Sequence, residues 1–431
     1  MTDTGPAILI HDALVVASPG TAEPFFGWVK LHGTCIESLG KGEPPEAAGA
    51  RVIDARGGIL IPGLVNTHAH SHSSLTRGSA EGMALEPWLM AGMREQTRLT
   101  AQQARVSAFA TYGEALLSGT TAVMDMCLMP EVAREAAREI GIRAVIAPRV
   151  ADRMSLAVKL DRAGAMIAAN RSGDRVQTCV GLHDLESASD DLIREGVALA
   201  KAYGVRVHLH CAESKFSTEK THSRTGRSPV AQLEYLGALG ENTHLAHCVW
   251  LDERDRALLA ARGASAAHCP HSNLKLGAGI AAVAAMRKAG VRVALGTDGA
   301  RANNRLDMFD VMKFASLIAK GTALDPCVLP ANEVLSMATA DGAAAIGLDT
   351  GEIAPGRPAD LTLVAVDRFH LQPAVPETVV TNLVHAARGS DVEMVIVDGV
   401  VVVDQGRLTL VDQDDIFARY VAAGRVLMAG D

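Results

Sequence analysis

Two histidines separated by one residue, His68 and His70, directly follow an apolar run over 58–65. The run is apolar enough to form a fully buried strand, and side chains alternate between the two faces of a strand. His68 and His70 therefore point the same way, about 7 Å apart along the chain. Neutral imidazole is a common protein ligand for zinc and related metals, so the pair can hold a metal ion. Two hydrogen-bonded core histidines would give the same pattern.

Similar groups close three later runs of strand-like sequence. His210 ends one run with Glu213 just beyond it, His247 ends the next, and Asp298 ends the last. If the strand ends share one face, three imidazoles and one carboxylate meet there, with Glu213 and His247 as additional acid–base groups. Such a donor set binds one divalent metal and leaves room for a water, whose pKa falls from about 15.7 to roughly 7. A hydroxide available at neutral pH is the nucleophile of a hydrolase.

Some of these residues fit other roles. Glu213 would also suit a solvated loop, and Asp298 before Gly299 is a common turn pair. His208 shares the parity of His210 but lies deeper in its strand, which is typical of a core histidine. Four further histidines lie near the same rim and fit loop or supporting roles equally well: His72, His222, His244 and His271.

The elements that must position these groups alternate regularly along the chain. We expect eight strands, over 60–70, 122–126, 144–150, 179–184, 205–211, 244–249, 265–269 and 291–298. Amphipathic Ala-rich stretches of helical length lie between them, over 101–118, 131–140, 190–202, 228–239, 252–262 and 280–289. Strands that alternate with helices pair in parallel, and eight such units close into a barrel whose reactive groups lie at the strand carboxyl ends. The sequence therefore predicts an α/β fold, a (β/α)8 barrel of the TIM type, over 58–351.

The flanks of the chain have a different character. Residues 7–57 and about 352–410 consist of short alternating runs separated by Gly, Pro and Asp turns. Neither flank alone has enough strands for a stable sheet. We expect the two ends to form one small composite β-sandwich domain, from residues 1–57 and from 352–431, the latter including a C-terminal helix.

Composition narrows the class of protein. The chain has 431 residues, 48% of them hydrophobic but only 3% aromatic, so a large core must be built mainly from aliphatic side chains. Its net charge of −8 comes without a block of basic residues, which argues against nucleic acid as a partner. No segment is apolar for long enough to cross a membrane, and the N-terminus does not have the pattern of an export signal, so we expect a soluble cytoplasmic protein. The seven cysteines form no Cys-x-x-Cys pair, and we expect neither disulfides nor a zinc knuckle.

Several phrases of the sequence resemble the amidohydrolase superfamily. The histidine pair at 68–70, His210 with Glu213, His247, and the segment 296–299 look like its metal-site pattern. The phrases at 66–68, 247–249, 272–277 and 296–300 resemble its aminohydrolase branch, and 351–361 resembles the returning β domain. That branch includes S-adenosylhomocysteine and methylthioadenosine deaminases, guanine and 8-oxoguanine deaminases, and triazine hydrolases such as atrazine chlorohydrolase.

The resemblance implies a role for each residue of the pattern. It implies a single metal, expected to be zinc with Fe²⁺ or Mn²⁺ as alternatives, held by His68, His70, His210 and Asp298. Glu213 would pass a proton to a ring nitrogen of the substrate, while His247 and Asp298 would orient and deprotonate the water. Two-metal members use a carboxylated lysine on strand four, and the segment 180–184 has no lysine, which favours one metal.

The expected reaction follows from charge. Attack of hydroxide at an amine-bearing ring carbon pushes electrons onto the neighbouring ring nitrogen, which must be protonated as the charge develops. Glu213 is placed to be that donor, and expulsion of ammonia completes a hydrolytic deamination. We expect the partners to be a small heterocyclic substrate and, in a homo-oligomer such as a dimer, further copies of the chain.

The substrate is inferred from three residues. In the nucleoside deaminases of the branch, the position that matches Gln96 is usually a glutamate that binds ribose hydroxyls, so glutamine favours a free purine, pterin or triazine-like ring. Trp88 would be a packing anchor or a wall for ring stacking, and His183 a substrate contact. The alternatives are an adenosine-type deaminase, a triazine hydrolase that removes chloride or an alkylamine, and a non-catalytic scaffold, which the complete set of ligands disfavours.

Overall fold

A parallel barrel forms the larger part of the molecule, as the sequence predicts. The computed structural model describes residues 7–46 and 48–429. In the described part, β6 (Leu64–Ala69), β7 (Thr120–Cys127), β8 (Arg143–Pro148) and β9 (Val176–Thr178) form one parallel sheet. A second parallel sheet contains β10 (Val180–Gly181), β11 (Val207–Cys211), β12 (Thr243–His247), β13 (Ser265–His268) and β14 (Arg292–Leu295).

Two backbone contacts join these sheets into a ring. Val150 and Leu182 form an isolated parallel bridge between the end of β8 and the end of β10. On the other side, the N–H of Asp298, beyond β14, donates to the carbonyl of His68 on β6 at 2.9 Å. The carboxyl ends of all the barrel strands therefore surround one opening, in which the expected site residues lie.

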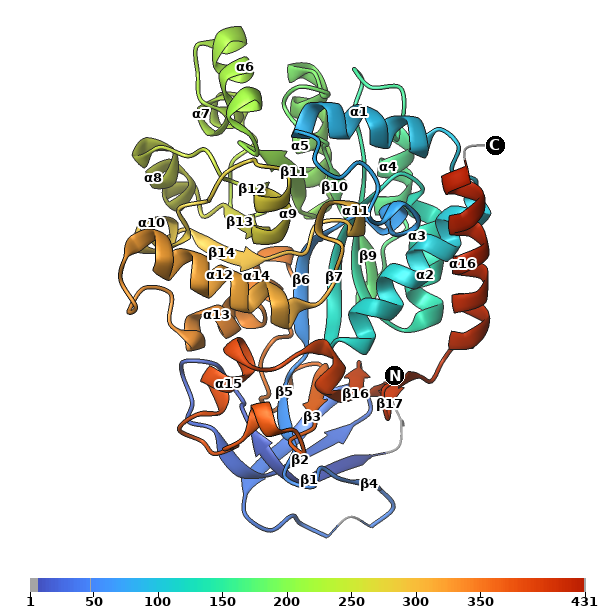
Figure 1. Cartoon of the computed structure of the whole chain (residues 1–431), viewed down its shortest axis with the longest axis vertical. Helices are drawn as coiled ribbons and strands as arrows, with labels where there is room; N and C mark the ends of the chain where they lie inside the picture. The colour runs from blue at the N-terminus through green and yellow to red at the C-terminus, as the bar shows by residue number, and fades with distance from the viewer. Residues whose placement is uncertain (1–6, 47, 430–431) are drawn as a thin grey trace.

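Helices surround the barrel (Figure 1). Their ends carry the usual stop and start residues: α5 begins after Ser189, whose hydroxyl accepts from the N–H of Leu192, and ends at Gly204 in the left-handed conformation. The barrel helices are α1 (Leu85–Gln96), α2 (Ala101–Leu117), α3 (Pro130–Ile140), α4 (Leu160–Ala168), α5 (Asp190–Tyr203), α6 (Lys215–Thr225), α7 (Pro229–Tyr235), α8 (Glu253–Arg262), α9 (Pro270–Lys275), α10 (Val283–Lys288), α11 (Ala300–Asn303), α12 (Met308–Ala323), α13 (Ala331–Met337) and α14 (Ala340–Ile346). Short 3₁₀ helices cover Ser71–Thr76 (η1), Phe369–Leu371 (η2) and Gly389–Asp391 (η3).

The first expected strand, 60–70, is two strands in the structure. β5 (Ile59–Pro62) belongs to the sheet formed by the chain ends, and only β6 belongs to the barrel. The break lies at Gly63, where a Cβ atom would come within 2.0 Å of the Thr121 hydroxyl oxygen, so only glycine allows this close approach. Of the fourth expected strand, 179–184, only β10 (Val180–Gly181) is a strand in the structure, and β9 (Val176–Thr178) precedes that range.

Both ends of the chain contribute to one nine-stranded sheet, as expected. It contains β1 (Ile8–Val15), β2 (Phe25–His32), β3 (Cys35–Lys41), β4 (Arg51–Asp54), β5, β15 (Leu361–Val364), β16 (Val392–Val397), β17 (Val400–Asp404) and β18 (Arg407–Leu408). β5 joins the two halves, because it pairs parallel to β1 and antiparallel to β15. Side chains from both halves, among them Ile10, Leu31, Leu363 and Ile396, share one buried cluster.

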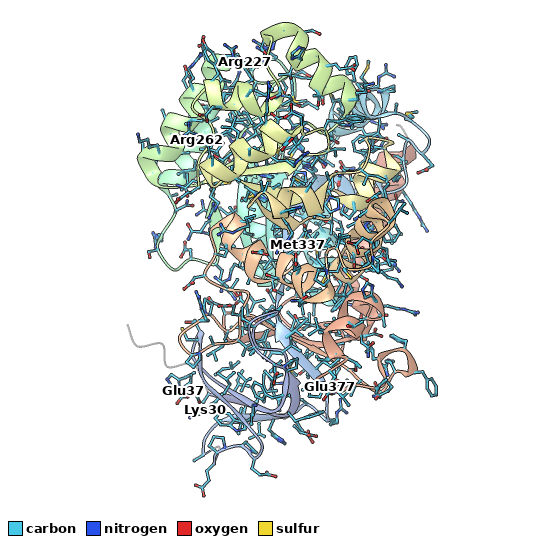
Figure 2. All side chains as sticks on the ribbon, turned by 90° about the vertical axis from the view of Figure 1, so that its left-hand side faces the viewer. Lys30, Glu37, Arg227, Arg262, Met337 and Glu377 are labelled. Atoms are coloured by element: carbon cyan, nitrogen blue, oxygen red, sulfur yellow. The ribbon has the colours of Figure 1, made fainter. Side chains whose placement is uncertain are left out.

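The end sheet lies at the foot of the barrel, opposite the opening (Figure 1). In Figure 2, Lys30 and Glu37, whose side chains form an exposed ion pair at 3.1 Å, mark this end, and Arg227 marks the other. Arg143 of β8 joins the two parts through bonds of 2.7 and 2.9 Å to the buried carboxylate of Asp360. These charge-assisted bonds raise the pKa of Arg143 against the opposing effect of its burial.

The last helix begins beside the end sheet and runs along the barrel. α16 (Gln413–Ala429) bonds to β18 through Gln413, which accepts from the N–H of Leu408 at 3.0 Å, and packs along α2 (Figure 1). The remaining short helix, α15 (Val379–His385), packs on α12 and α13. Leu427 of α16 is buried with Leu75 and Leu99, and the Tyr420 hydroxyl donates to the carbonyl of Ser74 at 2.7 Å. Within 7–46 and 48–429, no helix combines the length and apolar character needed to span a bilayer.

Candidate metal centre

Four expected ligands converge over the barrel opening. The distance from His70 Nε2 is 3.3 Å to His210 Nε2 and 3.3 Å to Asp298 Oδ1, and His68 Nε2 lies 3.8 Å from the same Oδ1. Atoms placed 2.0–2.1 Å from a tetrahedral ion lie about 3.3 Å from one another. The donor atoms of His68, His70, His210 and Asp298 therefore fit around one divalent ion with little rearrangement.

The hydrogen bonds behind the ligands turn each Nε2 towards this point. His70 Nδ1 donates to the carbonyl of Met126 at 2.7 Å, and His210 Nδ1 donates to the carbonyl of His183 at 2.7 Å. A carbonyl only accepts, so Nε2 of each neutral ring carries a free lone pair. His68 Nε2 is fully buried and has no hydrogen-bond partner in the described part of the chain, which fits an atom whose partner would be a metal.

The electrostatics of the site keep these imidazoles neutral. Burial lowers the pKa of His68 well below its ordinary value, and the neighbouring histidines lower it further. Burial also lowers the pKa of His70, although the charge of Asp298 acts in the opposite direction. Because a metal binds the deprotonated ring, the cluster is prepared for a cation at neutral pH.

Asp298 is held by its backbone and by a neighbouring hydroxyl. Its φ of 61° lies in the left-handed region, which is rare for a residue with a side chain and is found at functional sites. Oδ2 accepts from the Ser272 hydroxyl at 2.5 Å, and Oδ1 accepts from the N–H of Gly299 at 2.6 Å. Asp298 is thus fixed as part of the site and is more than a turn residue.

His247 and Glu213 face each other beside the ligands. His247 also has a left-handed φ, 73°, and its Nδ1 lies 2.9 Å from the side-chain oxygen of Asn273. Its Nε2 lies 3.7 Å from Glu213 Oε1. Burial raises the pKa of Glu213, and the nearby charge of Asp298 raises it further, against the lowering effect of His247. Glu213 is therefore better able to hold a proton than an ordinary carboxyl group.

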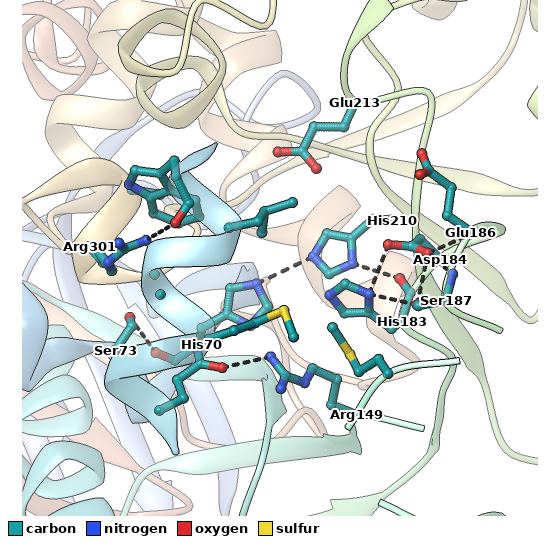
Figure 3. Close-up of a pocket in the computed structure, with 18 of the residues that line it drawn as sticks. His70, Ser73, Arg149, His183, Asp184, Glu186, Ser187, His210, Glu213 and Arg301 are labelled. Atoms are coloured by element: carbon teal, nitrogen blue, oxygen red, sulfur yellow. Dashed lines mark hydrogen bonds and ion pairs between the residues drawn. The ribbon is translucent and has the colours of Figure 1, made fainter. Parts of the chain in front are cut away.

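The pocket beside these groups has a volume of about 540 Å³, and the three substrate residues expected from sequence line it. Figure 3 shows one of them, His183, beside His210. His183 Nδ1 contacts Asp184 Oδ2 at 2.8 Å and the Ser187 hydroxyl at 2.9 Å, which leaves its Nε2 for a ligand. Trp88 lies under Arg301, with the guanidinium carbon 4.2 Å from the centre of a ring. Trp88 therefore has a packing contact and also borders the pocket, and both of its expected roles stay predictions.

Gln96 contacts a residue that sequence reasoning missed. Its side-chain oxygen accepts from Arg149 Nη1 at 3.1 Å, and Arg149 Nη2 donates to the carbonyl of Leu156 at 2.6 Å. Burial lowers the pKa of Arg149 to about 10, so the group stays charged at neutral pH. Across the described residues, no carboxylate forms an ion pair with it. Its place directly after a buried strand, on the rim that carries the histidines, was the signal available in the sequence.

Two more site residues come from the phrase 272–277, which carried the family resemblance but no assigned role. Ser272 and Asn273 lie in α9 and bond to Asp298 and His247, respectively. Neither residue type is chemically distinctive, so only their contacts reveal the role.

The remaining histidines have varied positions. His72 borders the pocket, with its Nε2 3.4 Å from the amide nitrogen of Gln96. His244 is buried behind the ligands, and His271 pairs with Asp310 at 3.2 Å. His222 is exposed on α6. His208 is buried as expected of a core histidine, but its Nε2 lies 2.9 Å from Nδ1 of His68.

We expect the purified protein to bind one equivalent of a divalent metal, measured by elemental analysis after dialysis. His70→Ala removes one of four donors and should lose most of the metal. His222→Ala, at an exposed position of α6, is the control and should keep it. Two equivalents in the unaltered protein, or full metal content in His70→Ala, would contradict the site.

The metal-free protein should lose stability in acid, because its buried histidines resist protonation. Burial lowers the pKa of His208 and of His268 to about 3 from an ordinary value of 6.5. Between these values the unfolded chain binds protons that the native state does not, so each histidine lowers the unfolding free energy by about 1.4 kcal/mol per pH unit as pH falls. In protein treated with a chelator, the contribution of these histidines to the melting temperature should be constant above about pH 6.5. The melting temperature should decrease as the pH falls below that value. Equal melting temperatures at pH 7 and pH 5 would refute this account.

Known proteins resemble this chain over most of its length. The model of the amidohydrolase family matches residues 59–402. A 5'-deoxyadenosine deaminase from Methanothermobacter thermautotrophicus is 37% identical over 388 residues, which cover 87% of this chain and 89% of the relative. A 5-methylthioadenosine/S-adenosylhomocysteine deaminase from Moorella thermoacetica is 37% identical over 422 residues, which cover 96% and 97%.

Solved structures with the same fold carry zinc. An adenosine deaminase from Xanthomonas campestris with bound zinc superposes with a TM-score of 0.91 at 28% identity and covers 98% of both chains. A mutant atrazine chlorohydrolase from Arthrobacter aurescens with zinc and atraton gives 0.89 at 25% identity, over 97% of this chain and all of the other. The chain therefore belongs to the amidohydrolase family, and it is a hydrolase of carbon–nitrogen bonds other than peptide bonds.

Proposed function

We propose that the protein is a zinc-dependent deaminase of adenosine-type nucleosides that carry a modified 5' end. The reaction is hydrolytic replacement of the amino group on the adenine ring, with release of ammonia. The observation that carries the proposal is the placement of Glu213 and His247 together beside four metal donors, at the mouth of one pocket. The names of the two relatives that match nearly the whole chain supply the substrate class.

Each residue has a defined task in this reaction. A divalent ion held by the three imidazoles and Asp298 would supply a water that loses its proton near neutral pH. Asp298 and His247 would accept that proton, and Asn273 keeps the His247 ring in place. Glu213, whose pKa is raised by burial, gives a proton to the ring nitrogen next to the reacting carbon. The amino group then takes up the proton that came from the water and leaves as ammonia, while the new hydroxyl group returns a proton to Glu213.

The far wall of the pocket bears on the choice between a nucleoside and a free ring. Gln96 alone favours a free ring, because it lacks the charge of the glutamate that usually binds ribose. Arg149 changes this argument, since its guanidinium lies 3.1 Å from the Gln96 oxygen and adds charged donors to the same wall. Amide and guanidinium together offer donors and acceptors to sugar hydroxyls. The relatives also bear nucleoside names, so support lies with the adenosine-type alternative and not with the free purine, pterin or triazine-like ring.

Glu213→Gln should lose turnover while keeping its metal, because the amide cannot deliver the proton. Losing a positioned proton donor costs about 10²- to 10⁴-fold in kcat. Glu186→Gln is the matched control, since Glu186 borders the same pocket but pairs with Lys220. Ammonia release and metal content are measured on both variants. If Glu213→Gln kept more than about a tenth of the original activity, another residue would be the proton donor.

A substrate panel tests the nucleoside proposal directly. We expect kcat/KM for 5'-deoxyadenosine, methylthioadenosine or S-adenosylhomocysteine to exceed that for adenine, guanine, isoxanthopterin and aminotriazines at least roughly tenfold. Hydrogen bonds from a charged group to the sugar contribute about 1.5–3 kcal/mol, which corresponds to roughly 10- to 150-fold. Gln96→Ala should lower kcat/KM for the nucleosides and leave that for free bases unchanged. If a free base or an aminotriazine had a higher kcat/KM than every nucleoside, the result would contradict the nucleoside proposal. It would support the interpretation based on Gln96 alone, in which the substrate is a free ring.

A further inference from the structure

His68 differs from the other two histidine ligands in what holds its ring. His70 and His210 donate from Nδ1 to the backbone carbonyls of Met126 and His183. Because these acceptors belong to the backbone, a side-chain substitution at Met126 or His183 does not remove them. Nδ1 of His68 instead lies 2.9 Å from Nε2 of another side chain, His208. The orientation of this one ring therefore depends on a side chain that can be replaced.

The bonds around His208 fix which nitrogen carries the proton. Nδ1 of His208 lies 3.0 Å from the carbonyl oxygen of His244, and a carbonyl can only accept. His208 therefore carries its proton on Nδ1, and its Nε2 is a lone-pair acceptor. That acceptor takes the hydrogen bond from Nδ1–H of His68. The proton of His68 is thus on Nδ1, which leaves the lone pair of its Nε2 facing Asp298 and the ligand cluster.

The proposal rests on the metal centre put forward above. We propose that His208 is a positioning residue for the metal site: it accepts the hydrogen bond of His68 Nδ1–H and so keeps the lone pair of His68 Nε2 aimed at the ion. The carbonyl of His244 fixes the proton of His208 on Nδ1. The free Nε2 of His208 in turn fixes the proton of His68 on Nδ1.

The surroundings of His208 leave it no freedom to reverse this pattern. Its side chain is fully buried, and its ring stacks on that of His244 with centroids 5.2 Å apart and planes at 19°. His244 is itself held, with Nδ1 2.9 Å from the Ser265 hydroxyl and Nε2 3.2 Å from the carbonyl of Thr67. The other tautomer of His208, with its proton on Nε2, would set a bare Nδ1 lone pair against the carbonyl oxygen of His244. It would also present N–H to His68, and His68 would then carry its proton on Nε2, where a metal cannot bind.

Core packing alone is the competing explanation, and it predicts a different result. If His208 only fills space, an apolar side chain of similar length would serve as well. If it acts as an acceptor, His208→Leu leaves the buried Nδ1–H of His68 without a partner and removes the preference for the productive tautomer. Loss of a partner behind a metal-ligating histidine typically costs about 10- to 100-fold in metal affinity.

The test compares three variants by competition for zinc with a chromophoric chelator, with folding checked by circular dichroism. His208→Leu removes the acceptor, whereas His208→Gln keeps a carbonyl oxygen near the position of Nε2. His268→Leu is the matched control, because His268 is 3% exposed at the end of β13 and its Nδ1 has no hydrogen-bond partner among the described residues. We expect the zinc affinity of His208→Leu to fall by 10- to 100-fold, and that of His208→Gln and His268→Leu to stay within about threefold of the unaltered protein.

Equal affinity for His208→Leu and the unaltered protein overturns the positioning role and leaves the deaminase proposal intact. Equal losses in all three variants also overturn it, because they would reflect the loss of any buried histidine. An unaltered protein that binds no zinc refutes the metal centre itself. Should His208→Leu fail to fold, ¹⁵N-histidine NMR of the unaltered zinc-loaded protein decides the question. Protons on Nδ1 of both His68 and His208 support the proposal, and a proton on Nε2 of His208 overturns it.

Discussion

The site depends on the closure of the barrel between its first and last strands. The N–H of Asp298 donates to the carbonyl of His68 at 2.9 Å, and the Thr67 hydroxyl donates to the carbonyl of Leu295 at 2.9 Å. The side chain of Asn66 adds two bonds to Thr297, one to its hydroxyl and one from its N–H. These contacts join segments more than two hundred residues apart in sequence. Without them the carboxylate would not meet the imidazoles, and no ligand set would exist.

Closure alone does not aim the side chains, and local backbone strain completes the arrangement. Asp298, His247 and Cys248 have φ of 61°, 73° and 51°, respectively. Each such conformation costs about 1–3 kcal/mol for a residue with a Cβ atom. These conformations turn the chain sharply at the end of β12 and after β14. As a result, the side chains of His247 and Asp298 face the opening. The short helix α9 supports both turns, since its Ser272 bonds to Asp298 and its Asn273 bonds to His247.

The sequence could predict which side chains the structure brings together, because strand parity and strand ends are local patterns. His68 and His70 share a face in any strand, and the regular alternation of elements places the ends of all the strands together. The break at Gly63 was missed because it arises from Thr121, which approaches from another strand. Arg149 and the hydrogen bond between His208 and His68 were missed for the same reason. The alternation of side chains along the strand placed His208 on the correct face. Only the distance between its Nε2 and Nδ1 of His68 shows that the two rings are in contact.

The histidine cluster also couples function to stability. Neutral imidazoles packed without a cation leave Nε2 of His68 buried and unpartnered, and an unpaired buried polar atom costs about 1–3 kcal/mol. A metal that binds only the folded chain offsets this cost and adds RT ln(1 + [L]/Kd), about 4 kcal/mol at a thousandfold excess over Kd. The same ion competes with protons for the imidazole lone pairs and so opposes protonation of the rings that bind it. The barrel opening is therefore a place where the fold is weakened to make a binding site, and the occupant of that site restores the stability of the fold.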